Sequence, residues 1–387
     1  MRIGILTHNY PLQSFEKKDA GIFIYDFAHA LAKKTGKVYI FCPNLIGKKE
    51  KYSETPVTWW RWAGEKAKLG SYKLYNPLTW WYFFDFFRQG RRAIAEFIKK
   101  NKIDFCLAMW AFPNGVFAWQ AKKTLGIPYA VWTLGSDIFL YAKFPGIKQL
   151  VQKVLRAASL GYGGGYEIAR RVQKISGRKC VYLPTATKVD AVRPKKVKLD
   201  PREFNFMYLG RLESVKGPDV LLEAAHLLAK KKRRWHLYMI GGGTMQATLE
   251  AKCKKYGLED QMTIFGRVDD QGTVNGYLKY CDAVVIPSRF DSLSLVFSES
   301  LKMGTPMISS DFGDIPKFIR KYKLGLVFCS EDAAHLARQM VKAMSLGENF
   351  KKRHLKNMPQ LAKIHDIDEV AKRFFQEAKM AVVSRRD

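Results

Sequence analysis

Residues 204–217 read Phe204-Asn205-Phe206-Met207-Tyr208-Leu209-Gly210-Arg211-Leu212-Glu213-Ser214-Val215-Lys216-Gly217. A mainly apolar run, typical of a buried parallel strand, leads directly into a turn that carries two cations, Arg211 and Lys216. The flanking glycines, Gly210 and Gly217, allow the backbone to come close to a ligand. Ligands of doubly wound sheets bind beyond the carboxyl ends of the strands, so this turn is a candidate site. Two cations there suit a diphosphate, and a solvated surface charge pair is the alternative.

The rest of the second half repeats this alternation of short apolar runs and helix-period segments. We expect strands near residues 206–209, 236–240, 263–265, 283–286, 307–309 and 326–328. Helices are expected at residues 218–230, 244–256 and 298–303. Such an order is typical of an α/β domain with a parallel sheet.

Three later segments of this half also follow expected strands. Gly242 lies in the glycine run 241–243, which opens a helix and leaves N–H groups for an anion, although a tight turn is the alternative. Val268 follows the next strand, at the level where a base would lie. Asp291 and Glu299, eight residues apart, are carboxylates that can bind sugar hydroxyls. Between them we expect the amides of Leu293, Ser294, Leu295 and Val296 to surround one ligand.

The first half shows the same α/β pattern, with strands expected near residues 3–7, 38–42, 104–108, 130–132 and 181–183. A segment with Pro184, Pro194 and Pro201 suits a linker. We therefore predict two Rossmann-like doubly wound domains facing across a cleft. The N-terminal domain is expected at residues 1–190 and the C-terminal domain at 191–365. Residues 366–387 are expected to form a helix that crosses back to the N-terminal domain.

Composition favours a folded, non-secreted protein. The chain has 387 residues, of which 47% are hydrophobic, enough for two well-buried cores. Its six cysteines show no CxxC spacing, which favours reduced thiols in the cytoplasm. Neither a signal-peptide layout nor an apolar run of ~20 residues is found, so we expect a soluble or peripheral protein.

Charge is unevenly distributed along the chain. The formal net charge is +31, of which +23 falls on residues 1–199 and +8 on residues 200–387. A cationic half favours an anionic membrane surface, an acidic acceptor or nucleic acid as partner. We favour peripheral binding to the inner face of the cytoplasmic membrane.

Residues 57–92 combine twelve aromatic side chains with interleaved basic ones. Tryptophan and basic residues both favour the headgroup region of an anionic bilayer, which predicts a membrane patch here. An aromatic core for the N-terminal domain is the alternative. Single-strand nucleic-acid binding also fits such a composition, but no recognised motif accompanies it, so we expect no nucleic-acid partner. The predicted patch comprises Trp59, Trp60, Trp62, Trp80, Trp81, Arg88, Arg91 and Arg92.

The second half resembles the donor domain of the retaining glycosyltransferases of family GT4, which have the GT-B fold. The family motifs G-R-L-x-x-x-K-G, apolar-G-x-G, A-D-x-x-x-x-P-S, E-x7-E and A-x-G-x-P-V-I correspond to residues 210–217, 240–243, 281–288, 291–299 and 302–308. The resemblance implies that Arg211 and Lys216 bind the donor diphosphate and that Glu299 binds the ribose. It also implies that Asp291, with the amides after it, holds the transferred sugar. Asp291, Arg211 and Lys216 are thus the expected catalytic residues.

The first half resembles this family more loosely. Gly21 is the single glycine of a loop in which the family usually has two, and we expect it near the donor phosphates. Residues 132–137 resemble T-x-H-G-S-D with Leu134 in place of the histidine. His8, Ser136 and Asp137 are the acceptor candidates. A glycine-rich stretch, 161–165, fails the G-x-G-x-x-G pattern and is interpreted as a close approach of backbone between the domains.

The resemblance implies transfer, with retention, from a nucleotide sugar to an acceptor hydroxyl on a lipid-linked or cell-envelope glycan. A UDP-sugar is the first expectation and a GDP-sugar the second. Two alternatives stay open: an inactive nucleotide-sugar-binding protein, because the family histidine is absent, and a nucleotide-sugar epimerase, because some proteins of the GT-B fold have that activity. No metal or other cofactor is expected. The one Asp-x-Asp, at Asp366 and Asp368, suits a helix start, and Arg211 and Lys216 would replace the metal.

Overall fold

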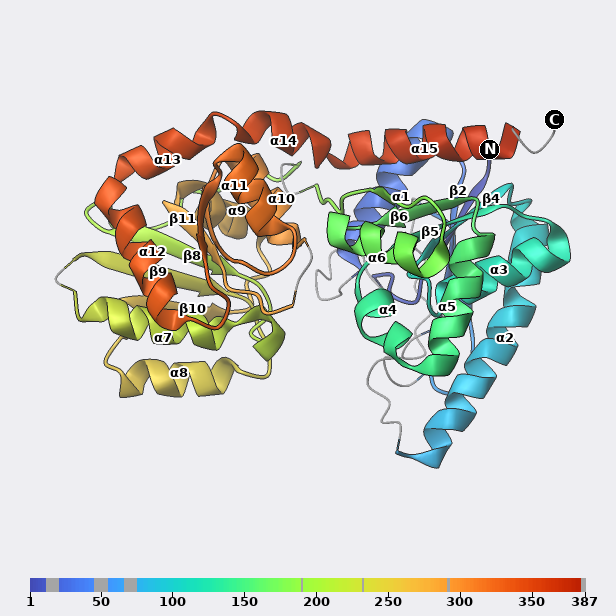
Figure 1. Cartoon of the computed structure of the whole chain (residues 1–387), viewed down its shortest axis with the longest axis horizontal. Helices are drawn as coiled ribbons and strands as arrows, with labels where there is room; N and C mark the ends of the chain where they lie inside the picture. Colours follow the sequence, from blue (N-terminus) through green and yellow to red (C-terminus); the bar gives the residue numbers. More distant parts are fainter. Residues whose placement is uncertain are drawn as a thin grey trace. The chain divides into compact units, whose positions relative to one another are not determined.

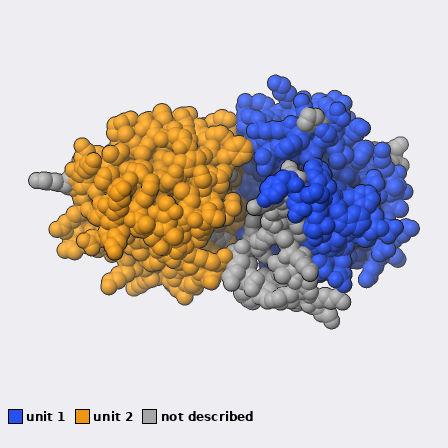
Figure 2. All heavy atoms as spheres, turned by 90° about the horizontal axis from the view of Figure 1, so that it is seen from below, with its two compact units in different colours: residues 1–185, 367–387 blue, residues 186–366 orange. Residues whose placement is uncertain are grey.

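The computed structural model describes residues 1–11, 21–44, 55–65, 75–188, 191–231, 233–290 and 293–383. The chain forms two compact units, drawn in different colours in Figure 2. The first comprises residues 1–185 together with 367–387, and the second comprises residues 186–366. Each unit is an α/β layer structure with its own buried core.

The first unit is built on a parallel sheet in the order β3-β2-β1-β4-β5-β6-β7. Figure 1 labels β2, β4, β5 and β6 of this sheet. The described part of the chain supplies seven strands, and every pairing among them is parallel. They are β1 (Ile3–Leu6), β2 (Val38–Pro43), β3 (Val57–Trp60), β4 (Phe105–Met109), β5 (Tyr129–Thr133), β6 (Leu160–Gly163) and β7 (Val181–Tyr182).

Helices cover both faces of this sheet. One face is covered by α1 (Ile22–Thr35) and by α15 (Ile367–Val383), the last helix of the chain. Phe374 of α15 is fully buried, with ring centroids 5.6 Å from Phe27, 6.3 Å from Phe105 and 5.9 Å from Tyr162. The remaining elements of this unit are α2 (Pro77–Asn101), α3 (Asn114–Leu125), α4 (Ser136–Phe139), the short 3₁₀ helix Tyr141–Lys143, α5 (Pro145–Ala157) and α6 (Tyr166–Ser176).

The second unit has a parallel sheet in the order β10-β9-β8-β11-β12-β13. Its described strands are β8 (Phe204–Leu209), β9 (Trp235–Ile240), β10 (Met262–Gly266), β11 (Ala283–Ile286), β12 (Met307–Ser310) and β13 (Gly325–Phe328). The helices are α7 (Pro218–Ala229), α8 (Gln246–Lys255), α9 (Gln271–Tyr280), α10 (Leu295–Met303), α11 (Ile315–Tyr322), α12 (Ala333–Leu346), α13 (Glu348–Leu355) and α14 (Met358–Ile364).

Two doubly wound parallel sheets are the architecture that the sequence predicts. All six strands expected in the second half are found, within one or two residues at most ends. Two strands of the first half were not predicted. The β3 strand lies inside the aromatic segment, and β6 lies at the glycine-rich stretch.

The glycine-rich stretch was therefore misinterpreted. A Cβ on Gly163 would lie 2.5 Å from the backbone nitrogen of Ala169, so the close approach is to α6 of the same unit. Among the helices of the described residues, none is both long and apolar enough to cross a membrane.

Candidate functional site

In the second sheet, the order in which the chain adds strands reverses between β8 and β11. Chain connections leave these adjacent strands toward opposite sides, which makes this edge of the sheet the usual place for a ligand. Two segments meet there: the turn 210–217, which follows β8, and the segment that follows β11 at Pro287. The amide of Arg289 donates to the carbonyl of Val215 at 3.0 Å, so the two segments touch.

The turn after β8 is held by backbone pairing that continues beyond the strand ends. The amide of Gly210 donates to Ile240 at 3.0 Å, and the amide of Leu212 donates to Gly242 at 3.0 Å. The Glu213 carboxylate accepts from the Thr244 hydroxyl at 2.7 Å and from its amide at 3.0 Å, and these bonds lower the pKa of Glu213. The turn then closes in a 3₁₀ helix, Ser214–Lys216.

Glycine is required at two places in this arrangement. Gly217 has φ of +66°, and a Cβ there would lie 2.1 Å from the carbonyl oxygen of Pro287. Gly241 has φ of +144°, and its Cβ would lie 1.8 Å from the carbonyl oxygen of Gly210. Gly242, by contrast, has open space, with only the Cβ of Arg267 within 4 Å, at 3.6 Å. Of these three glycines, only Gly242 leaves room for a ligand.

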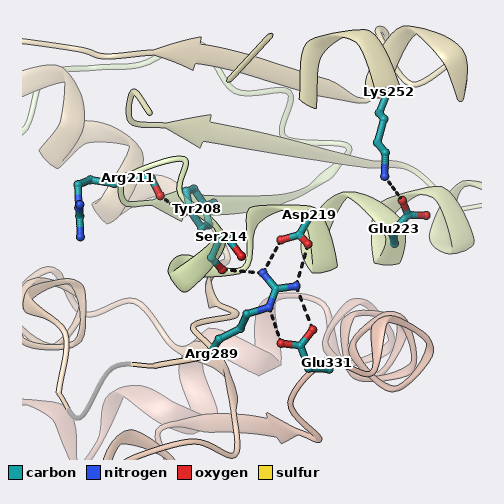
Figure 3. Close-up of polar contacts among 8 residues, drawn as sticks. All are labelled: Tyr208, Arg211, Ser214, Asp219, Glu223, Lys252, Arg289 and Glu331. Carbon is teal, nitrogen blue, oxygen red and sulfur yellow. Dashed lines mark hydrogen bonds and ion pairs between the residues drawn. The ribbon is translucent and has the colours of Figure 1, made fainter. Parts of the chain in front are cut away.

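The two predicted cations differ in their surroundings. Arg211 is exposed, and within the described parts of the chain its guanidinium forms no hydrogen bond or ion pair. Its backbone carbonyl accepts from the Tyr208 hydroxyl at 2.7 Å, which fixes the main chain at this point. In Figure 3 the Arg211 side chain lies apart from the neighbouring ion cluster. Lys216 is half-buried in the 3₁₀ turn.

Beyond β11, the helix α10 begins at Leu295, three residues earlier than expected. The first amides of a helix have no partner within it, so those of Leu295 and Val296 are available to a ligand. Leu293 and Ser294 are buried, at 7% and 8% exposure. Ser294 is the residue before the helix, yet its hydroxyl caps no amide and has no hydrogen-bond partner within the described ranges. Asp291 lies outside the described residues.

Glu299 and Val268 lie around this edge of the sheet. Glu299, in the second turn of α10, is half-buried, and its Oε1 accepts from the Thr187 hydroxyl at 3.4 Å. Lys302, one turn later, donates to the Thr187 carbonyl at 2.9 Å and lies 3.6 Å from Asp366. Val268 is half-buried in the loop between β10 and α9.

In the first unit, Gly21 has a packing role. It precedes α1, and a Cβ there would lie 2.1 Å from the carbonyl oxygen of Asn9. His8 is half-buried against the Trp110 ring, at 4.6 Å between centroids, and its Nδ1 lies 2.8 Å from the Asn114 amide nitrogen. Burial lowers the pKa of His8 to about 4, so the imidazole is neutral at pH 7.

Asp137 is engaged by the backbone, contrary to the expectation that it faces an acceptor. It is fully buried, and its carboxylate accepts from the amides of Ala111 at 2.7 Å, Gly135 at 3.1 Å and Leu134 at 3.3 Å. Burial raises the pKa of Asp137 to about 6, although these N–H groups favour the charged form. Asp137 thus ties the loops after β4 and β5 together. Its neighbour Ser136 is exposed.

The predicted membrane patch is divided by the structure. Trp60 and Trp62 are only 5% and 4% exposed and belong to the core, where Trp60 stacks on Phe41 at 5.6 Å. They therefore cannot face a membrane, because both rings pack against Phe86 of α2, with centroids 5.0 and 5.1 Å away. Trp59 is half-buried on β3. The rest of the predicted patch is exposed on α2, at Trp80, Trp81, Arg88, Arg91 and Arg92.

Arg289 is a residue of this site that the sequence did not single out. It lies just after the Pro287-Ser288 motif, and its guanidinium joins residues from three other elements of the unit (Figure 3). Its partners lie 42 to 75 residues away along the chain, so no local sequence pattern indicates these contacts. Within the described residues, no three His, Cys, Asp or Glu side chains group closely enough to hold a metal ion.

Comparison with known proteins finds similarity to glycosyltransferases. Residues 191–358 match the family described as Glycosyl transferases group 1. D-inositol 3-phosphate glycosyltransferase 2 of Catenulispora acidiphila is 25% identical over 252 residues, 58% of each chain. A putative teichuronic acid biosynthesis glycosyltransferase, TuaC of Bacillus subtilis, is 24% identical over 245 residues, 60% of this chain and 59% of that protein.

Solved structures share the fold over almost the whole chain. Sucrose-phosphate synthase of Thermosynechococcus elongatus superposes with a TM-score of 0.78 at 17% identity, covering 99% of this chain and 100% of the other. HepE of Anabaena, solved in complex with UDP, gives a TM-score of 0.70 at 14% identity, covering 97% and 99%. The alignments to the two curated relatives span less than two thirds of their length.

Proposed function

This chain belongs to the glycosyl transferases group 1 family through residues 191–358, and on that premise we propose that it is a retaining glycosyltransferase. It moves a sugar from a nucleotide-sugar donor to an acceptor hydroxyl. The observation that carries the proposal is the edge between β8 and β11. One end of a parallel sheet carries three features there. They are an exposed arginine without a partner in the described ranges, a half-buried lysine and the free amides of α10.

We assign the donor diphosphate to Arg211 and Lys216. Transfer breaks the bond between the anomeric carbon and a diphosphate oxygen, and the acceptor oxygen bonds to that carbon. The acceptor proton passes to the departing diphosphate, whose growing negative charge the two cations stabilise. Neither the neutral His8 nor the engaged Asp137 is a strong base, which agrees with a path that needs no protein base.

The remaining donor groups follow from the same edge. The amides of Leu295 and Val296, with Asp291, hold the transferred sugar, and Glu299 holds the ribose. A UDP-sugar is the favoured donor, in keeping with the UDP bound to HepE, a protein of the same fold. The hexosyl or N-acetylhexosaminyl class of the sugar is part of this proposal, as is transfer without a metal ion.

We further propose that the acceptor lies on a lipid-linked or cell-envelope glycan and that α2 binds the inner face of the cytoplasmic membrane. Leu78, Trp80, Trp81 and Phe84 are each at least half exposed. Trp81, Phe84, Arg88 and Arg91 recur at helical spacing, so aromatic and then basic side chains share one side of α2. Such a face suits the headgroup region of anionic lipids.

Nucleotide release tests the catalytic proposal. UDP-sugars and GDP-sugars are incubated with the protein and a membrane extract, and free nucleoside diphosphate is measured. We expect release with one donor class and a fall of at least about a hundredfold in Arg211→Ala and Lys216→Ala. Lys254→Ala, at the far end of α8, serves as the matched loss of one surface charge. Donor binding without turnover would instead support the inactive binding protein.

Vesicle flotation tests the membrane proposal. The protein should float with phosphatidylglycerol vesicles and much less with phosphatidylcholine vesicles. The double variant Trp80→Ala, Trp81→Ala should lose this binding, whereas Phe144→Ala removes an aromatic ring that is 47% exposed elsewhere and should retain it. Equal flotation on both lipids would remove membrane binding from the account.

A further inference from the structure

Arg289 lies at the centre of an ion cluster beside the cationic turn (Figure 3). Its Nη1 and Nη2 donate to the two oxygens of Asp219, at 2.6 and 2.7 Å, in a bidentate pair. Its Nη2 donates to Glu331 at 2.9 Å, and its Nε donates to the other oxygen of the same carboxylate. Asp219 lies in the first turn of α7, and Glu331 lies in the loop between β13 and α12.

The same residue also holds the cationic turn itself. Nη1 donates to the carbonyl of Ser214 at 2.6 Å, and the Arg289 amide donates to the carbonyl of Val215 at 3.0 Å. These carbonyls are the first two of the 3₁₀ helix whose third residue is Lys216. Arg289 therefore holds the turn directly before Lys216 through one side-chain and one main-chain hydrogen bond.

The carboxylates around Arg289 make it unsuitable as a cation that binds the ligand itself. The hydrogen bonds that Arg289 donates to Asp219 and Glu331 raise the pKa of Arg289, so it stays charged, with two carboxylates around it. Burial would raise the pKa of Asp219, but the bonds and charge of Arg289 outweigh burial and lower it. The Arg289 side chain is 22% exposed, so solvent screens these ion pairs only in part. With two carboxylates around one guanidinium, the positive charge of Arg289 is more than offset, and the cluster suits a structural clamp.

We propose that Arg289 is a positioning residue, which holds the 3₁₀ turn so that Lys216 meets the donor diphosphate. This inference rests on the proposed function, because it assigns that ligand to Lys216. A lysine at position 289 cannot replace the arginine, since one ammonium lacks the planar fork that reaches both carboxylates and the Ser214 carbonyl together.

A double-mutant cycle with UDP as the probe tests this role. Titration calorimetry gives the Kd of UDP for the full-length protein, Arg289→Ala, Lys216→Ala and the double variant. We expect Arg289→Ala to weaken UDP binding about tenfold, and to have almost no further effect once Lys216 is already alanine. Arg289→Lys should weaken binding nearly as much as alanine does. Arg202→Ala, which breaks an exposed bidentate pair with Asp200 away from the turn, should leave the Kd unchanged.

The cycle separates failure of the inference from failure of the proposed function. If Lys216→Ala weakens UDP binding while Arg289→Ala does not, or if the two effects simply add, the positioning role is wrong and the diphosphate site stands. If Lys216→Ala leaves the Kd unchanged, both are overturned. A fold defect is separated by the unfolding midpoint of each variant and by the double variant, because general loosening would also weaken UDP binding in the Lys216→Ala background.

Discussion

At the scale of single residues, the Ser294 hydroxyl is the clearest sign that a ligand belongs at α10. Serine at this position normally caps the helix, and a buried hydroxyl without a partner costs about 1–3 kcal/mol. The Ser294 side chain is 8% exposed and caps nothing within the described residues. A polar group of the donor would supply the missing bond.

Ser294→Ala should therefore separate stability from binding. The ligand-free protein should unfold at the same or a slightly higher temperature, because an unsatisfied group is removed. The affinity for the nucleotide sugar should fall, by up to about tenfold. Thermal unfolding with and without the donor gives both quantities. A loss of stability without ligand would show instead that the hydroxyl supports the fold.

Short motifs in the sequence were enough to predict where three of the candidate residues lie in the fold. Arg211, Lys216 and Gly242 lie where their strand-to-turn spacing predicted, at strand ends of one sheet. Arg289 was passed over because its partners come from remote loops and helices, and no local pattern records them. Asp137 was misassigned for a related reason: a carboxylate that binds backbone amides has no distinctive sequence spacing.

At the scale of elements, the loops after β4 and β5 depend on one carboxylate. Asp137→Asn keeps the shape of the side chain but places an amide group against one of the backbone N–H donors. At least one buried N–H then loses its acceptor, so we expect a loss of about 1–3 kcal/mol in the free energy of unfolding. Urea titration measures it, with the exposed neighbour Ser136→Ala as control. An unchanged midpoint in Asp137→Asn would contradict the tie between the loops.

The strands that the sequence missed share a physical cause. The β3 strand carries Trp59 and Trp60, whose aromatic side chains suit a sheet, a core and a membrane equally well, so composition could not choose among them. The β6 strand contains glycines, which are unfavourable in strands, and one of them, Gly163, is required because α6 comes so close. Strands with continuous aliphatic runs were predicted correctly.

At the scale of the whole molecule, the first unit is completed by the last helix of the chain. The α15 helix covers one face of its sheet through Phe374. Phe374→Ala removes a fully buried ring and should cost about 3–5 kcal/mol. Met380→Ala, 63% exposed on the same helix, should cost little.

Calorimetry of Phe374→Ala and Met380→Ala measures this difference in stability. With two units, we expect the transition of the first unit to shift in Phe374→Ala while that of the second stays in place. Equal shifts in Phe374→Ala and Met380→Ala would contradict a core role for α15.

The central claim is that the edge between β8 and β11 binds a nucleoside diphosphate through Arg211. Titration calorimetry with UDP measures this directly, on the unmodified chain, Arg211→Ala and the charge-matched control Lys254→Ala. We expect Arg211→Ala to weaken UDP binding at least about tenfold with an unchanged unfolding midpoint, because the guanidinium has no partner within the described ranges to lose. Lys254→Ala should bind as the unmodified chain does. Unchanged affinity in Arg211→Ala, or the same loss in Lys254→Ala, would contradict the account.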